Sequence, residues 1–270
     1  MDVSRIFSHR NRALLRELVA TDFKLRYQGS ALGYLWSLFR PLFLFGILLI
    51  VFGLILKVGS NIEHYSIYLL LGIVLWNFFL EATNNGLHSI LNRGDLIRKI
   101  NFPKYIIVIS GTISALINLG ISLIVVLIFM AFSSVELRPL ALLLPLLIVE
   151  LYIFALALAF FLSALYVKYR DITYIWELIM QAAFYATPIL YPLALVTAKS
   201  AILAKLLLLN PMAQIVQDAR YVLITPQTDT LIKLSNNKFA IAVPILIVLA
   251  TVLVAGWYFK KSSKYFAEDV

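Results

Sequence analysis

The sequence has no cysteine among its 270 residues and only three histidines. Without cysteine the chain can form no disulfide bond, thiolate metal site or cysteine nucleophile. The histidines, His9, His64 and His88, fall in separate regions and lack the spacing of metal ligands. We therefore expect neither a metal site nor catalytic residues, unless a site is built from residues far apart in the chain.

Charged residues are also scarce, at 14% of the sequence against 62% hydrophobic residues, and the mean hydropathy is +0.92. A water-soluble protein of this size could not enclose so much apolar surface in one core. The composition therefore predicts an all-α polytopic membrane protein. The formal charge of +9 would suggest a nucleic-acid partner if the basic residues shared one soluble face, but they fall between apolar runs.

Six apolar stretches come near or above the roughly 20 residues that a helix needs to cross a bilayer. They cover about 34–57, 65–88, 105–132, 139–166, 173–193 and 239–259. Lysine and arginine are more than twice as frequent in the segments on one side of these stretches as on the other. Under the positive-inside rule this bias predicts six spans with both termini in the cytoplasm.

The segments outside the spans complete a single transmembrane domain over residues 1–270. Residues 8–28 are rich in arginine and lysine, which an anionic leaflet attracts, and we interpret them as an amphipathic interface helix on membrane lipids. Gly29 and Gly33 would allow the chain to bend from this helix into span one. Spans one to five would occupy residues 34–193.

The stretch between spans five and six is too polar to cross the membrane twice. Within residues 198–225, Asn210-Pro211 separates two short apolar segments, which predicts two short helices. They could be re-entrant if their broken backbone is buried in protein, or they could form an amphipathic surface hairpin. Span six follows at residues 239–259.

Nothing in the sequence supplies an energy source. The phosphate-binding pattern G-x-x-x-x-G-K-[ST] is absent, so we expect no ATP site and no other cofactor in this chain. Glu81, Glu150 and Glu177 would each cost about 2.5–3.5 kcal/mol if ionised at the bilayer centre. They lie near span ends, which favours anchoring at the interface over a proton relay.

Two inner loops could contact a cytoplasmic partner. Residues 92–104 mix four cations with apolar residues, which is typical of a short amphipathic helix for protein docking; the alternative is a helix resting on lipid headgroups. The Lys168–Asp171 cluster fits the positive-inside rule and, as a second interpretation, a docking loop.

Aromatic residues in spans one and five recur at spacings that could line one face of a helix. Aromatic rings pack well against the apolar faces of sugars, although lipid-facing or interfacial positions are the alternative. The candidate residues for a substrate path are Trp36, Phe39, Phe43, Phe184, Tyr185 and Tyr191.

Several short motifs follow one another along nearly the whole chain: Asp22, Lys24, Arg26, Tyr27, Ser30, Leu32, Gly33, Trp36 and Pro41; Arg98, Lys99, Phe102 and Pro103; Tyr169, Arg170 and Asp171; and Thr187, Pro188, Ile189, Tyr191, Asn210, Pro211 and Met212. In their order and spacing they resemble the membrane subunits of ABC-2 type transporters that export polysaccharides, the group of O-antigen and teichoic acid permeases. Thr187 stands where serine is more common in that family.

The resemblance implies a homodimer in the bacterial cytoplasmic membrane, paired with two ATP-binding-cassette subunits that bind ATP and Mg. The substrate would be a glycan on a polyprenyl diphosphate lipid. Residues 94–103 would form the coupling helix, and residues implied in ATPase coupling are Asp22, Lys24, Arg26, Ile97, Arg98, Lys99, Phe102, Pro103, Arg170 and Asp171. Those implied in a re-entrant gate are Pro188, Asn210, Pro211 and Met212.

Two other function classes stay open on the sequence alone. An ion-coupled secondary transporter would need a titratable pair within the membrane, and no such pair can be recognised in the sequence. An integral-membrane lipid-modifying enzyme would be active as a purified chain without ATP.

Overall fold

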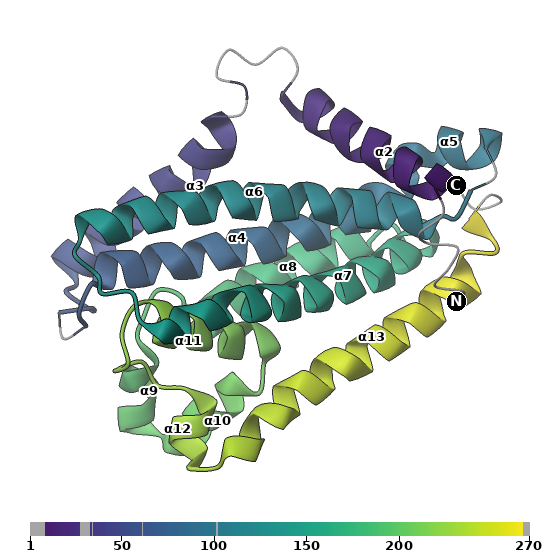
Figure 1. Cartoon of the computed structure of the whole chain (residues 1–270). Helices are drawn as coiled ribbons and strands as arrows, with labels where there is room; N and C mark the ends of the chain where they lie inside the picture. The colour runs from purple at the N-terminus through teal and green to yellow at the C-terminus, as the bar shows by residue number, and fades with distance from the viewer. Residues whose placement is uncertain (1–8, 28–32, 34, 61, 101, 267–270) are drawn as a thin grey trace.

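The structure, a computed structural model, describes residues 9–27, 33, 35–60, 62–100 and 102–266 (Figure 1). Every regular element in these ranges is a helix, and none is a strand. This agrees with the all-α fold class expected from the apolar runs.

Four helices in the described ranges are long and apolar enough to cross a membrane. They match the expected spans two, three, four and six. The four are α4 (Tyr65–Ser89), α6 (Tyr105–Phe132), α7 (Leu144–Lys168) extended by the 3-10 turn η3 (Pro139–Leu143), and α13 (Ala242–Ser262) extended by η4 (Lys238–Ile241).

Helix α4 is the centre of the bundle. It packs against α6 and α7, and residues 67–75 are all buried. At Gly86 the helix approaches α7 so closely that an added Cβ would lie 2.2 Å from the Cβ of Ala159. Helix α13 packs against α7.

The expected spans one and five are shorter than the other four. Helix α3 (Leu35–Leu48) continues into a π-helical segment, η1 (Leu49–Ile55), and the two together contain an apolar helical stretch, Pro41–Ile55, that is shorter than the four long helices. Pro41 lies inside α3. Helix α8 (Ile172–Ala186) has 15 residues, about 22 Å of helix against roughly 30 Å of hydrocarbon. The six-span count therefore stays a prediction.

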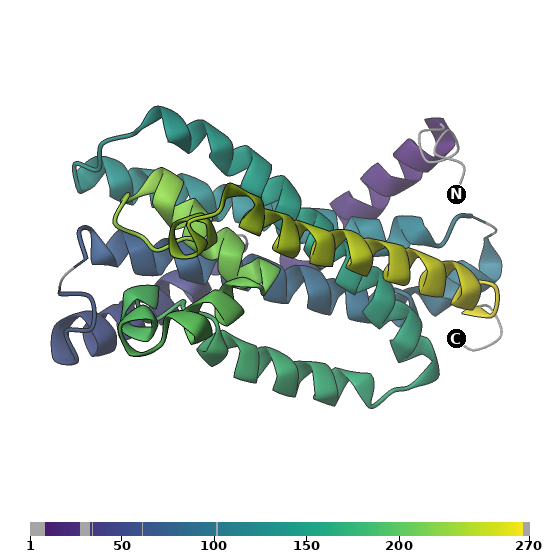
Figure 2. The same ribbon diagram turned by 90° about the horizontal axis from the view of Figure 1, so that it is seen from below.

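The short helices gather at two opposite ends of the bundle (Figures 1 and 2). One end holds the start of α2 (His9–Tyr27), η2 (Leu91–Arg93), α5 (Gly94–Lys99) and the α7–α8 connection. The other end holds α9 (Leu193–Lys199), α10 (Ala201–Leu208), α11 (Pro211–Leu223) and α12 (Leu231–Ser235). These are the ends that the charge bias assigns to the inner and outer sides, and we name them the inner and outer ends.

The predicted helix pair between spans five and six is present. The break at Asn210 and Pro211 separates α10 from α11, and the Asn210 side chain caps α11 by accepting a hydrogen bond from the Met212 amide at 3.0 Å. A further helix, α9, precedes them. Whether this assembly is re-entrant stays a prediction.

Candidate functional site

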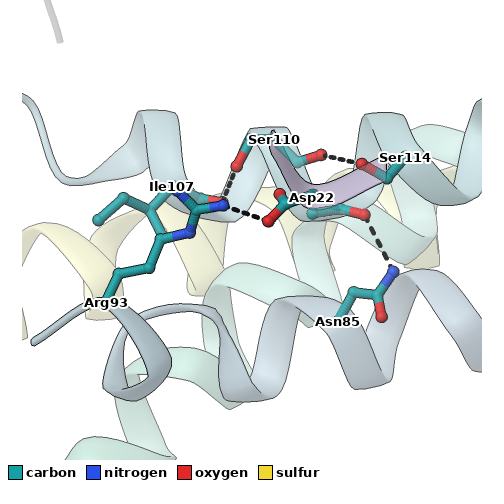
Figure 3. Close-up of polar contacts among 7 residues, drawn as sticks. Asp22, Asn85, Arg93, Ile107, Ser110 and Ser114 are labelled. Carbon is teal, nitrogen blue, oxygen red and sulfur yellow. Dashed lines mark hydrogen bonds and ion pairs between the residues drawn. The ribbon is translucent and has the colours of Figure 1, made fainter. Parts of the chain in front are cut away.

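An ion pair joins α2 to the segment before α5 at the inner end. The Arg93 guanidinium donates to the carboxylate of Asp22, and both side chains are partly buried (Figure 3). Asn85 on α4 donates to the Gly111 carbonyl oxygen of α6 at 3.2 Å in the same region. Three elements, α2, η2 and α6, are thereby held around the inner half of α4.

A cavity of about 490 Å³ lies beside this ion pair, in the size range of ligand pockets. Its walls contribute amide, imidazole and hydroxyl groups and one charge of each sign, so they suit an uncharged polar ligand better than an anion. The lining residues are Asp22, Asn84, Asn85, His88, Ser89, Asn92, Arg93, Ile107, Gly111 and Ser114.

The polar groups of this cavity are not arranged as a hydrolase triad. The Ser89 hydroxyl donates to the Gly86 carbonyl, and the Ser114 hydroxyl donates to that of Ser110. His88 Nδ1 lies 3.0 Å from the Asn84 carbonyl oxygen, and the Asp22 carboxylate is engaged by arginine. No three histidine or carboxylate side chains in the described ranges gather as a possible metal site.

The side chains of the predicted coupling helix divide into a buried and an exposed set. Ile97 and Phe102 are buried, so they are not the exposed apolar docking surface that the sequence suggested. They belong to a hydrophobic cluster with Leu18 of α2 and Phe259 of α13. The helix ends at Lys99, before the expected limit of residue 103, and Pro103 is partly buried.

Several exposed residues at the inner end are basic. Arg98, Lys99 and Lys24 are exposed, and Arg170 and Asp171 are exposed in the α7–α8 connection. The Arg26 side chain and Gly29 lie outside the described part of the chain. The inner end therefore presents charged side chains, carried by a packed apolar layer, to any cytoplasmic partner.

The predicted path aromatics form two local groups. On α3, Trp36 and Phe43 are 49% and 66% exposed, and the Phe39 and Phe43 ring centroids are 6.4 Å apart. At the end of α8, the Phe184 ring packs on Trp76 of α4 and on Tyr185. The Tyr191 hydroxyl donates to the carbonyl oxygens of Tyr185 and Ala186. Whether substrate contacts either group stays a prediction.

Arg220 on α11 organises the outer end, although in the sequence it is only one basic residue of the loop between spans five and six. Its side chain is fully buried and donates from Nε to the Tyr68 carbonyl oxygen at 3.0 Å. Its Nη1 and Nη2 donate to the carbonyl oxygens of Pro188 and Ile189 at 2.6 and 2.7 Å. The available signal in the sequence was a single basic residue in a segment of thirteen residues that has no other lysine or arginine.

Of the residues predicted for the gate, one contacts this arginine and the other three lie at the start of its helix. Pro188 accepts one of its hydrogen bonds, and Pro211 and Met212 are buried at the start of the same helix. Asn210 is exposed and acts as the helix cap. The end of α8, the start of α4 and α11 thus form one packed unit.

Comparison with known proteins identifies the family of this chain. Residues 13–224, from α2 to the end of α11, match the family described as ABC-2 type transporter. The O-antigen export system permease protein RfbA of Myxococcus xanthus is 28% identical over 269 residues, which cover 96% of each chain. Two Klebsiella pneumoniae proteins of the same name are 28% identical over 204 and 206 residues, covering 75% of this chain and 77% of theirs. The chain therefore belongs to the ABC-2 type transporter family and is a multi-pass membrane transport protein.

Proposed function

We propose that this chain is the membrane subunit of an ATP-driven exporter that moves a lipid-linked polysaccharide of O-antigen or teichoic acid type across the bacterial cytoplasmic membrane. The observation that carries the proposal is the similarity, over almost the whole chain, to a permease named for O-antigen export. In this function, two copies would pair with two ATP-binding-cassette subunits, which would bind ATP and Mg.

Features of the sequence and of the inner end support an ATPase that is a separate protein. The sequence has no phosphate-binding loop, and the exposed Arg98 and Lys99 lie at the end of a helix whose other side is fixed in the core. A push on α5 would be transmitted through Arg93 to Asp22 on α2, and through Ile97 to the buried layer beneath. Such rigid connections suit mechanical coupling.

The test is a deletion strain with a reconstituted system beside it. Loss of the gene is expected to cause lipid-linked glycan to accumulate in the inner leaflet, and the purified chain is expected to form a stable complex with an ATP-binding-cassette protein. Transport of glycan lipid by the isolated chain in liposomes without nucleotide would reject the proposal. The proposal would also be rejected if a complex with an inactive ATPase still transported glycan lipid and still prevented its accumulation in cells.

A further inference from the structure

Two carboxyl groups meet at the outer end, where α11 packs against α7. Glu150 lies on α7 and Asp218 on α11, both are partly buried, and their charges act on each other. The Oε1 atom of Glu150 is buried and has no hydrogen-bond partner among the described residues. Two neighbouring carboxylates in such surroundings cannot both be ionised without a large penalty.

A buried amide lies between these two groups. Gln214 is fully buried, its Nε2 donates to Asp218 Oδ2 at 2.6 Å, and its side chain also interacts with the Glu150 carboxyl. Its Oε1 is buried and accepts no hydrogen bond within the described part of the chain. The cluster therefore has more acceptors than donors, and the missing component is a donor.

The cations around α11 do not supply that donor. Arg220 is held by three backbone carbonyls, and Arg138 donates from Nη2 to the Tyr221 carbonyl oxygen at 3.1 Å. Neither carboxyl forms an ion pair with a described lysine, arginine or histidine. The other titratable groups on the elements packed against α11 are Lys205 on α10, Tyr65, Tyr68, Glu81 and His88 on α4, Tyr152, Tyr166 and Lys168 on α7, and Tyr258, Lys260 and Lys261 on α13.

We propose that Glu150, Asp218 and Gln214 form a proton-binding site that fastens α11 to α7. One carboxyl group keeps its proton and donates it in a hydrogen bond to the other carboxylate or to Gln214 Oε1. The proton comes from water, and its release leaves two carboxylates facing each other. With the proton bound the contact is attractive; without it, like charges push α11 away from α7.

The surroundings allow this proton to exchange near neutral pH. Burial raises the pKa of Asp218 to about 6, and the hydrogen bond from Gln214 opposes that rise. Because the two carboxyl groups interact, their titration belongs to the pair as a unit. Glu150 and Asp218 thus form a partly buried titratable pair that could not be recognised in the sequence. The contact between α11 and α7 at the outer end would therefore depend on pH.

Infrared difference spectroscopy of the full chain in lipid nanodiscs tests the site directly. The protonated carboxyl band of the wild type is expected to fall by about tenfold between pH 5 and pH 7, as for a group that titrates near pH 6. The isosteric changes Asp218→Asn and Glu150→Gln are each expected to remove this step. Glu136→Gln, an exposed outer-loop exchange, is the matched control and is expected to retain it.

Three results would overturn the site. The first is an unchanged titration in both variants, and the second is a spectral step produced at constant pH when sodium replaces choline, which would indicate a metal cation. The third is a band that does not shift when wild-type protein is labelled with ¹³C-aspartate or with ¹³C-glutamate. This measurement uses wild-type protein alone and therefore does not depend on folding of the variants. The measurement needs neither ATPase nor glycan, so it stands apart from the proposed function.

Discussion

The guanidinium carbon of Arg220 lies 3.6 Å from the centroid of the Tyr68 ring, although the two residues are 152 positions apart in the chain. The Tyr68 hydroxyl in turn lies 3.2 Å from Gln217 Oε1 and donates to it. An ammonium group cannot replace a planar guanidinium that stacks on a ring and donates hydrogen bonds to three carbonyl oxygens. This contact fixes α11 to the start of α4.

Replacement of Arg220 is expected to destabilise the outer end. Arg220→Lys keeps the charge but cannot reach the carbonyls of Tyr68, Pro188 and Ile189 together, and each carbonyl left without a donor costs about 1–3 kcal/mol. The thermal midpoint of the purified protein should fall clearly, and Arg220→Met should lower it as well. An exposed exchange, Lys199→Met, is the control. Unchanged midpoints for both arginine variants would show that the contact is dispensable.

Gly86→Ala is expected to push α4 and α7 apart. The new methyl group would lie 2.2 Å from the Ala159 Cβ and 2.9 Å from its Cα, and overpacking of this kind costs about 1–3 kcal/mol. Gly120→Ala on α6 meets nothing within 4 Å and should be neutral or slightly stabilising, because alanine favours a helix by about 1 kcal/mol. Denaturation of both variants in the same detergent makes the comparison; equal midpoints would contradict the close approach.

Breaking the ion pair between Asp22 and Arg93 is expected to loosen α2. Arg93→Glu places like charges together, whereas the double exchange Asp22→Arg with Arg93→Glu restores an attraction worth about 1 kcal/mol at this partly exposed position. Hydrogen exchange of the α2 amides should become faster in the single variant and return towards the wild-type rate in the double variant. Faster exchange in both would show that the pair does not hold the helix.

Charge reversal on the exposed side of α5 is expected to weaken binding of an ATPase subunit. Arg98→Glu with Lys99→Glu should lower the affinity by about tenfold or more, because like charges at an interface repel, and should leave the thermal midpoint unchanged. Ile97→Asp should instead lower the midpoint, since this side chain is buried. Normal co-purification with the charge-reversed protein would remove α5 from the docking surface.

The stability of the protein is expected to depend on pH through Asp218. Its pKa is raised from the ordinary value of 3.8 to about 6, so the folded state binds the proton more tightly than the unfolded state. The contribution to stability is therefore full below about pH 4 and is lost as the pH rises through about 6. Asp218→Asn should leave the thermal midpoint unchanged at low pH and raise it relative to wild type at pH 7.5. A constant difference across this range would contradict the assignment.

The sequence was sufficient for the long spans and insufficient for the contacts between them. The four long helices follow from apolar length alone, and Asn210-Pro211 marked the start of α11 because asparagine caps and proline begins helices. The amphipathic pattern of residues 92–104 predicted a helix, but such a pattern does not say what covers its apolar face. In the structure the cover for Ile97 and Phe102 is the protein itself.

The outer-end contacts were beyond sequence reasoning for a related reason. Arg220, Glu150 and Asp218 acquire their roles only when α11 packs against α4 and α7, and nothing local specifies that packing. In the sequence Glu150 looked like an ordinary charge near a span end, and Asp218 and Arg220 looked like ordinary charges of a loop. Their burial and partners, which distinguish them, are properties of the tertiary structure.

The central position of α4 bears on how the chain is made. Among the four long helices it is the least apolar and the most enclosed by protein, with 78% of an apolar 18-residue stretch buried. Its neighbours α6 and α7 are synthesised later, so at the moment it leaves the ribosome it has no cover for Asn84, Asn85 and His88. Helix α4 therefore depends on α6 and α7 to cover its polar side chains, and it can reach its final surroundings only after both of these helices have been synthesised.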